Sequence, residues 1–81
     1  MYSTNHLQTE CCAALGPMSA AIRAERVLRD AGITAHVIAL EPDETKRGCA
    51  FGIAYTCTED GRVRATLRAN RISVSQYFKK G

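Results

Sequence analysis

One residue, Cys49, carries the strongest signal for chemistry in this chain of 81 residues. It follows Lys46, Arg47 and Gly48, and it precedes an apolar run that begins at Ala50. The thiolate is the reactive form of cysteine, and neighbouring positive charges stabilise it. Many cysteines, however, are small apolar side chains that pack in a core. The local sequence therefore leaves two interpretations open: a reactive thiol, or an inert side chain at the start of a strand.

The other three cysteines show no spacing typical of a zinc site. Cys11 and Cys12 are adjacent, Cys57 stands apart from them, and no Cys-x-x-Cys pair occurs. His6 and His36 lie at no ligand spacing. We therefore predict no structural metal and no cofactor, and we expect these cysteines to be structural. Two weaker alternatives stay open. One of these three cysteines resolves a disulfide with Cys49, or the fold brings them together with Cys49 as a transient metal site.

Composition indicates one small globular domain over residues 1–81, with an ordered core over about residues 8–78. The chain is 46% hydrophobic and 23% charged, which is typical of a folded protein rather than a disordered one. No segment has the length of a membrane span, and the first residues do not have the pattern of a signal peptide. We therefore expect a cytoplasmic protein, in which the four cysteines are mostly reduced.

The basic residues do not predict a nucleic-acid partner. The formal net charge is only +3, and the arginines are spread over residues 23–29 and 62–71. A dedicated nucleic-acid binder has a denser basic surface with aromatic side chains interleaved. On the predicted sheet only Phe51 and Tyr55 could stack on bases, and we expect both in the core or at an interface.

Hydrophobic periodicity predicts four strands and two helices. The expected strands are residues 8–15, 33–40, 50–58 and 72–78, and the expected helices are residues 19–31 and about 59–70. Ser19 is the predicted N-cap of the first helix, and Gly32 the left-handed residue that ends it. The order β-α-β-β-α-β predicts an α+β fold, the ferredoxin-like two-layer sandwich.

The same patterns predict which side chains are buried. In the first helix the apolar stripe is Ala20, Ala24, Val27, Leu28 and Ala31, and in the second helix the anchors are Val63 and Leu67. Cys11 and Cys12 must face opposite sides of their strand, so at least one is expected to be buried. In the third strand, Phe51, Ile53, Tyr55 and Cys57 share one face, and Gly52, Ala54 and Thr56 form a face of small residues that permits close packing.

This topology bears on Cys49. In a β-α-β unit the two strands run parallel, so the connection over residues 41–49 should return to the edge where the first helix begins. A helix N-terminus carries about half a positive charge. Together with Lys46 and Arg47, that charge would lower the pKa of the Cys49 thiol. We therefore predict a partly exposed, activated thiol, against the alternative that Cys49 points into the sheet.

Four segments carry a resemblance to a known family: residues 21–28, 30–33, 40–42 and 48–53. Their Ala-x-x-Ala-Glu helix, Ala-Gly-Ile ending, Leu-x-Pro turn and Gly-Cys motif resemble the selenium/sulfur carrier-like domains, over residues 10 to about 78. The resemblance implies that Cys49 holds sulfur or selenium as a persulfide or perselenide, that Gly48 allows close backbone approach, and that Ser19 is the turn serine. The chain departs from the commoner motif at Ala50, where glycine is usual.

Two functions follow as hypotheses. In the first, Cys49 passes sulfur between a donor protein and an acceptor protein, and Lys46, Arg47 and the amides near Ser19 stabilise the bound anion. Such a chain is a carrier more than a stand-alone enzyme. In the second, the domain is a protein-binding or homodimerising module with no chemistry.

Overall fold

The computed structural model describes residues 10–41 and 50–80, and within them it contains four strands and two α-helices. In chain order these elements are β1 (Glu10–Gly16), α1 (Met18–Asp30), β2 (Ala35–Ala39), β3 (Phe51–Thr56), the short 3-10 helix η3 (Cys57–Glu59), α2 (Asp60–Ala69) and β4 (Gln76–Lys80). The order β-α-β-β-α-β agrees with the expectation from the sequence. Neither of these helices combines the length and the apolar character that crossing a bilayer requires.

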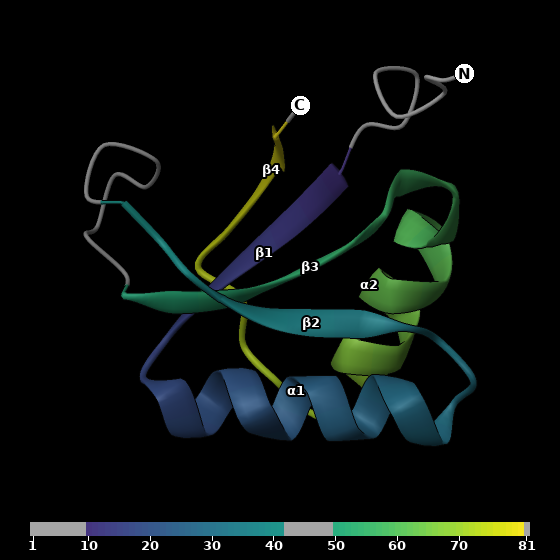
Figure 1. Cartoon of the computed structure of the whole chain (residues 1–81). Helices are drawn as coiled ribbons and strands as arrows, with labels where there is room; N and C mark the ends of the chain where they lie inside the picture. Colours follow the sequence, from purple (N-terminus) through teal and green to yellow (C-terminus); the bar gives the residue numbers. More distant parts are fainter. Residues whose placement is uncertain (1–9, 42–49, 81) are drawn as a thin grey trace, which may run out of the picture.

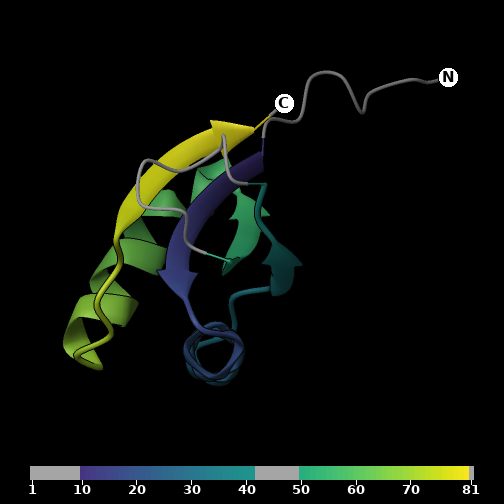
Figure 2. The ribbon, with the colours of Figure 1, turned by 90° about the vertical axis from the view of Figure 1, so that its left-hand side faces the viewer.

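The four strands form one antiparallel sheet in the order β2-β3-β1-β4 (Figure 1). Because β1 and β2 both run antiparallel to β3, which lies between them, they run parallel to each other. The molecule is therefore a small α+β domain. Figure 2 shows α1 end-on beneath the strands, as a separate layer from the sheet.

Both helices pack on the same face of the sheet. The side chains that meet there share the odd-numbered positions of the strands and one stripe of each helix. They are Cys11, Ala13, Leu15, Ala35, Ile53 and Tyr55 from the strands, and Ala21, Ala24, Leu28, Val63 and Leu67 from the helices. The predicted anchors of α2 and the alternation of β3 are confirmed. In α1 the buried stripe is rotated from the predicted one: Ala21 is buried and Ala31 is exposed.

The opposite face of the sheet carries small side chains at its centre. Cys12, Ala14 and Ala54 are at most 2% exposed, so both Cys11 and Cys12 are buried, on opposite faces as predicted. A Cβ atom on Gly52 would collide with the carbonyl oxygen of Ala13 in the neighbouring strand. Glycine at this position therefore allows the close approach of β3 and β1.

Both helices end in the same backbone motif. Gly32 adopts a φ of 80°, and the amide of Ile33 donates to the carbonyl of Leu28 over 2.9 Å, as in a Schellman motif. This confirms the predicted end of α1. In α2 the equivalent left-handed position is Arg71, with a φ of 58°, and the Ile72 amide donates to Leu67 over 2.9 Å.

The predicted start of α1 was wrong. The N-cap is Pro17, whose carbonyl accepts the amides of Ala20 and Ala21 at 3.1 and 3.2 Å. Ser19 lies inside the first turn, where its hydroxyl caps no amide. Proline fits this position because its fixed φ is already compatible with the turn into a helix.

The last strand also differs from its prediction. It spans Gln76–Lys80 rather than residues 72–78, because the chain first has to return from the end of α2 to the sheet. Ile72 and Val74, within this connection, pack against the core. The backbone amide of Ser75 then donates a 2.8 Å hydrogen bond to the Ala14 carbonyl, which links the connection to β1. The alternation of apolar residues in this segment therefore reflects packing against the core, and it does not indicate a strand.

Candidate functional site

The residues predicted to do chemistry lie largely outside the described part of the chain. Lys46, Arg47, Gly48 and Cys49 fall within residues 42–49, which the structure leaves undescribed. Ser19 is described and is exposed in the first turn of α1. The surroundings of Cys49 are therefore built from the residues on either side of it in the chain.

Those flanking residues meet at one edge of the sheet. Phe51, the first residue of β3, pairs with Ala39 at the end of β2 and with Gly16 at the end of β1. Beyond this row, the Leu40 amide donates a 2.8 Å hydrogen bond to the Ala50 carbonyl. The connection that contains Cys49 therefore leaves and rejoins the sheet at the edge where β1 ends (Figure 1).

The beginning of α1 lies at this same edge. The helix starts at Met18, two residues after Gly16, and its first turn contains no acidic side chain. The positive end of the helix is therefore not neutralised by a carboxylate of its own first turn. This positive end is one contribution that the sequence predicted near Cys49, and the other, from Lys46 and Arg47, lies outside the described residues.

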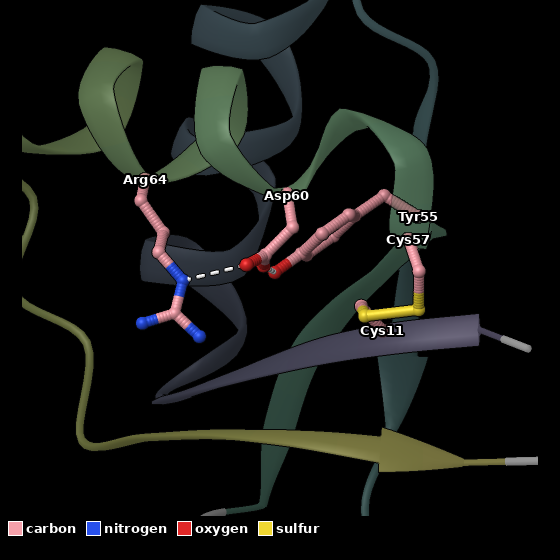
Figure 3. Close-up of a disulfide and its surroundings, with 5 residues drawn as sticks. All are labelled: Cys11, Tyr55, Cys57, Asp60 and Arg64. Atoms are coloured by element: carbon pink, nitrogen blue, oxygen red, sulfur yellow. Dashed lines mark hydrogen bonds and ion pairs between the residues drawn. A yellow bond between two sulfur atoms is a disulfide. The ribbon is translucent and has the colours of Figure 1, made fainter.

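A second group of reactive side chains lies at the other end of β3. Cys57, in η3, forms a disulfide with Cys11 of β1 (Figure 3). In the β1–β3 register Cys11 pairs with Tyr55. Cys57 comes two residues after Tyr55 in the chain, so it leaves β3 on the same face of the sheet as Tyr55 and Cys11. The expectation that the cysteines are mostly reduced was therefore wrong for this pair. It also removes both sulfurs from a shared metal site while the disulfide is intact.

A hydrogen-bonded set of side chains surrounds this disulfide. The Tyr55 hydroxyl donates to Oδ1 of Asp60 over 2.7 Å, and Nε of Arg64 donates to Oδ2 of the same carboxylate over 2.9 Å. The Arg64 guanidinium lies 4.0 Å from the centre of the Tyr77 ring. Burial, together with the hydrogen bond to Asp60, raises the pKa of Tyr55 well above its usual range.

A comparison with protein families matches residues 10–79 of the chain to the family described as "Putative Se/S carrier protein-like". The chain belongs to this family. In searches of the curated proteins and of the solved structures, nothing matched this Se/S carrier-like chain. The resemblance that the sequence motifs indicated is thereby confirmed at the level of the family.

In this Se/S carrier-like chain Ala50 and Cys57 flank the six-residue strand β3 at opposite ends. An extended strand advances about 3.3 Å per residue, so β3 alone spans roughly 20 Å. Cys49 lies outside the described residues, so the alternative in which another cysteine resolves a disulfide with it stays a prediction.

Sequence reasoning placed the cysteines on faces but missed the disulfide. It assigned Cys57 to the same face as Ile53 and Tyr55, but it placed Cys57 in a strand, whereas β3 ends at Thr56 and Cys57 lies in η3. It also lacked the register of β1 against β3. An antiparallel pairing of β1 with β3 would have been enough to suggest the bond. The Tyr55–Asp60–Arg64 set was missed as well, although Asp60 and Arg64 have the spacing of a helical ion pair.

The aromatic residues of β3 do not form a surface for RNA bases. Tyr55 is buried beneath the helices, and Phe51 packs against the same core. This agrees with the expectation that both residues belong to the core. Recognition of RNA on a sheet face needs exposed aromatic side chains that stack on bases, and the aromatic residues described in β3 are not exposed in this way.

Proposed function

We propose that this chain is a sulfur or selenium carrier and that Cys49 is the residue that holds the transferred atom. Membership of the Se/S carrier-like family is the observation that carries the proposal. The sheet edge supports it, because the Leu40–Ala50 hydrogen bond ties both ends of the 41–49 connection close to the beginning of α1. The partners are a protein that donates sulfur or selenium and a protein that accepts it.

The proposed transfer is an exchange at sulfur without net oxidation. The Cys49 thiolate attacks the outer sulfur of a donor persulfide, the donor S–S bond breaks, and the donor sulfur leaves with the bonding pair and takes up a proton. Cys49 then carries a persulfide. A thiolate of the acceptor attacks its outer sulfur in the same way, which restores the Cys49 thiolate.

The residues around Cys49 have proposed roles in this exchange. Lys46 and Arg47 stabilise the anionic sulfur, together with the positive end of α1 near Ser19. Gly48 leaves the backbone beside the sulfur open to an approaching partner. Ser19, exposed in the first turn of α1, can donate its hydroxyl to the bound anion.

The fold and location belong to the same proposal. We assign the element order to the ferredoxin-like class, as a single domain over residues 1–81. We place the carrier in the cytoplasm, where low-molecular-weight thiols keep most disulfides reduced. In that compartment the Cys11–Cys57 disulfide would be exposed to reductants.

Intact-mass measurement after incubation with a small persulfide donor tests the proposal. The wild-type protein should gain one sulfur atom that a reductant removes, and Cys49→Ser should gain none. Cys12→Ser is the matched control, because it removes a fully buried thiol and should leave the gain unchanged. Equal gain in wild type and Cys49→Ser would remove Cys49 from the chemistry.

A specific observation favours the second candidate, a protein-binding or dimerising module. Met18 and Ile22 on α1 are 48% and 41% exposed, and a groove of about 510 Å³ runs along the same face beside Arg23 and Arg26. Exposed apolar side chains rimmed by charge are typical of an interaction surface. If sedimentation shows a dimer that Ile22→Lys dissociates while sulfur loading fails, this candidate replaces the carrier.

A further inference from the structure

The Cys11–Cys57 disulfide borders a cavity that the proposed carrier chemistry does not use. The cavity has a volume of about 240 Å³, and its walls include Cys11, Tyr55, Asp60, Arg64, Tyr77 and Lys79. It is smaller than the pockets that hold drug-sized ligands, so it suits a molecule the size of an amino acid. A disulfide in the wall of a cavity can meet a small reactant without unfolding of the chain.

The charges around this cavity favour an anion. Asp60 is the one carboxylate in its walls, and it is bonded to both the Tyr55 hydroxyl and Arg64 Nε. The terminal nitrogens of Arg64 point away from Asp60 (Figure 3). Lys79 pairs directly with Cys11 in the β1–β4 register, so the two side chains lie on the same face. Two cations against one carboxylate give the walls of this cavity a net charge of +1.

The orientation of the disulfide decides which sulfur a reactant meets. Of the two bonded cysteines, Cys11 is the one that lines the cavity. Thiol–disulfide exchange proceeds by attack of a thiolate on one sulfur while the other sulfur leaves. A thiolate in the cavity would therefore attack Cys11 and displace Cys57.

Cys57 is well placed to be the leaving sulfur. It is half-buried rather than buried, and it lies in η3 immediately before α2. Glu59, the last residue of η3, and Asp60, the first residue of α2, are ion-paired with Arg62 and Arg64 at 2.7 and 2.9 Å. A departing thiolate at Cys57 would lie close in the chain to the positive end of α2, whose first turn carries the acidic residue Asp60.

We propose that Cys11–Cys57 is a redox-active disulfide whose cavity admits a small anionic thiol, such as a mercaptocarboxylate. The thiolate attacks Sγ of Cys11, the Sγ–Sγ bond breaks, and Cys57 leaves with the electron pair as a thiolate. A second thiolate then attacks the sulfur of the first, which releases Cys11 as a thiolate. Two thiols are oxidised to one disulfide, and the protein gains two electrons and, on protonation, two protons. This site goes beyond the carrier proposal and is independent of Cys49.

The rate of reduction by three thiols of different charge tests this inference. The probes are 3-mercaptopropionate, 2-mercaptoethanol and cysteamine, which are anionic, neutral and cationic. The protein is the folded full chain with the substitution Cys49→Ser. The rate at which each thiol reduces its disulfide is divided by the rate at which the same thiol reduces a small uncharged disulfide, which corrects for the intrinsic reactivity of the thiol. We expect the normalised rate to be several-fold higher for the anionic probe than for the cationic one. An acid-quenched sample should carry the mixed disulfide on the Cys11 peptide.

Two arginine variants locate the effect. Arg64→Gln should abolish most of the preference for the anionic probe, whereas Arg68→Gln, one turn further along α2 and outside this cavity, should retain it. Dividing by the neutral-thiol rate removes any general loosening of the fold that Arg64→Gln causes. Equal normalised rates for the three probes in the parent protein would overturn the proposal. Reduction no faster than global unfolding would overturn it too, because the disulfide would then be purely structural.

Discussion

The amide of Leu40 donates a 2.8 Å hydrogen bond to the carbonyl of Ala50, and this bond closes the connection that contains Cys49. It continues the pairing of Ala39 with Phe51 by one step beyond the end of the sheet. The edge where it lies is also the edge where β1 ends and α1 begins. The proposed carrier cysteine immediately precedes Ala50, the acceptor in this bond.

The first prediction concerns the acidity of the Cys49 thiol. Alkylation of Cys49 as a function of pH should give a midpoint below the ordinary thiol pKa of about 8.5, because Lys46, Arg47 and the positive end of α1 favour the thiolate. Replacing both Lys46 and Arg47 by glutamine should raise that midpoint. Arg62→Gln is the control, since Arg62 is paired with Glu59 at the other end of the sheet. An unaltered midpoint near 8.5 in all three proteins would count against an activated thiol.

The second prediction compares two glycines. Gly52→Ala should lower the free energy of unfolding by about 2 kcal/mol or more, because its Cβ would collide with the backbone of Ala13. Gly61→Ala should instead raise it by about 0.5–1 kcal/mol, since Gly61 lies in α2 with open space around it. Urea titration of both variants measures the difference. Equal stabilities for the two variants would contradict the close approach of β3 to β1.

The third prediction concerns the end of α2. Arg71 holds a φ of 58°, a conformation that costs a non-glycine residue roughly 1 kcal/mol. Arg71→Gly should therefore raise the free energy of unfolding by up to about 1 kcal/mol, and thermal unfolding of the variant beside wild type measures this change. Arg68→Gly, within the last turn of the same helix, should destabilise by about 1 kcal/mol. A loss of stability in Arg71→Gly would show that this side chain makes a contact worth more than the strain.

The fourth prediction is a loss of stability at alkaline pH. The pKa of Tyr55 is raised in the folded state by burial and by its bond to Asp60, and the pKa of Tyr77 is raised by burial. Above about pH 10 tyrosine ionises in the unfolded chain while Tyr55 keeps its proton. The unfolded state then binds fewer protons, so the free energy of unfolding should fall as the pH rises, by up to about 1.4 kcal/mol per pH unit for Tyr55.

Tyr55→Phe supplies the control for that titration. It should unfold more easily than wild type at pH 7, because Asp60 loses a hydrogen bond, but its stability should fall less steeply above pH 10. Denaturant unfolding at a series of pH values measures both effects. Parallel pH profiles for the two proteins would show that Tyr55 ionises equally in the folded and unfolded states.

Much of the fold could be predicted because it rests on local patterns. The order of elements follows from hydrophobic periodicity, the end of α1 follows from Gly32, and the anchors of α2 follow from the spacing of Val63 and Leu67. These signals are contained within one element or its ends. They do not depend on which strands lie side by side.

The features that could not be predicted depend on contacts between distant segments. The Cys11–Cys57 bond requires the register of β1 against β3, which no single strand pattern encodes. The segment before β4 alternates like a strand, yet Ile72 and Val74 serve as packing residues on the way back to the sheet. The start of α1 is a local exception: the helix begins two residues earlier than predicted from Ser19, and Pro17 is its N-cap.

The most direct test of the carrier follows one isotopically labelled sulfur through a full cycle. The protein is loaded from a labelled persulfide donor, separated from the donor, mapped by peptide mass and then mixed with an acceptor thiol. The carrier account predicts one labelled sulfur per chain, on the peptide that contains Cys49, and its complete passage to the acceptor. Label that is found on Cys11 or Cys57, or that persists in Cys49→Ser, would contradict it.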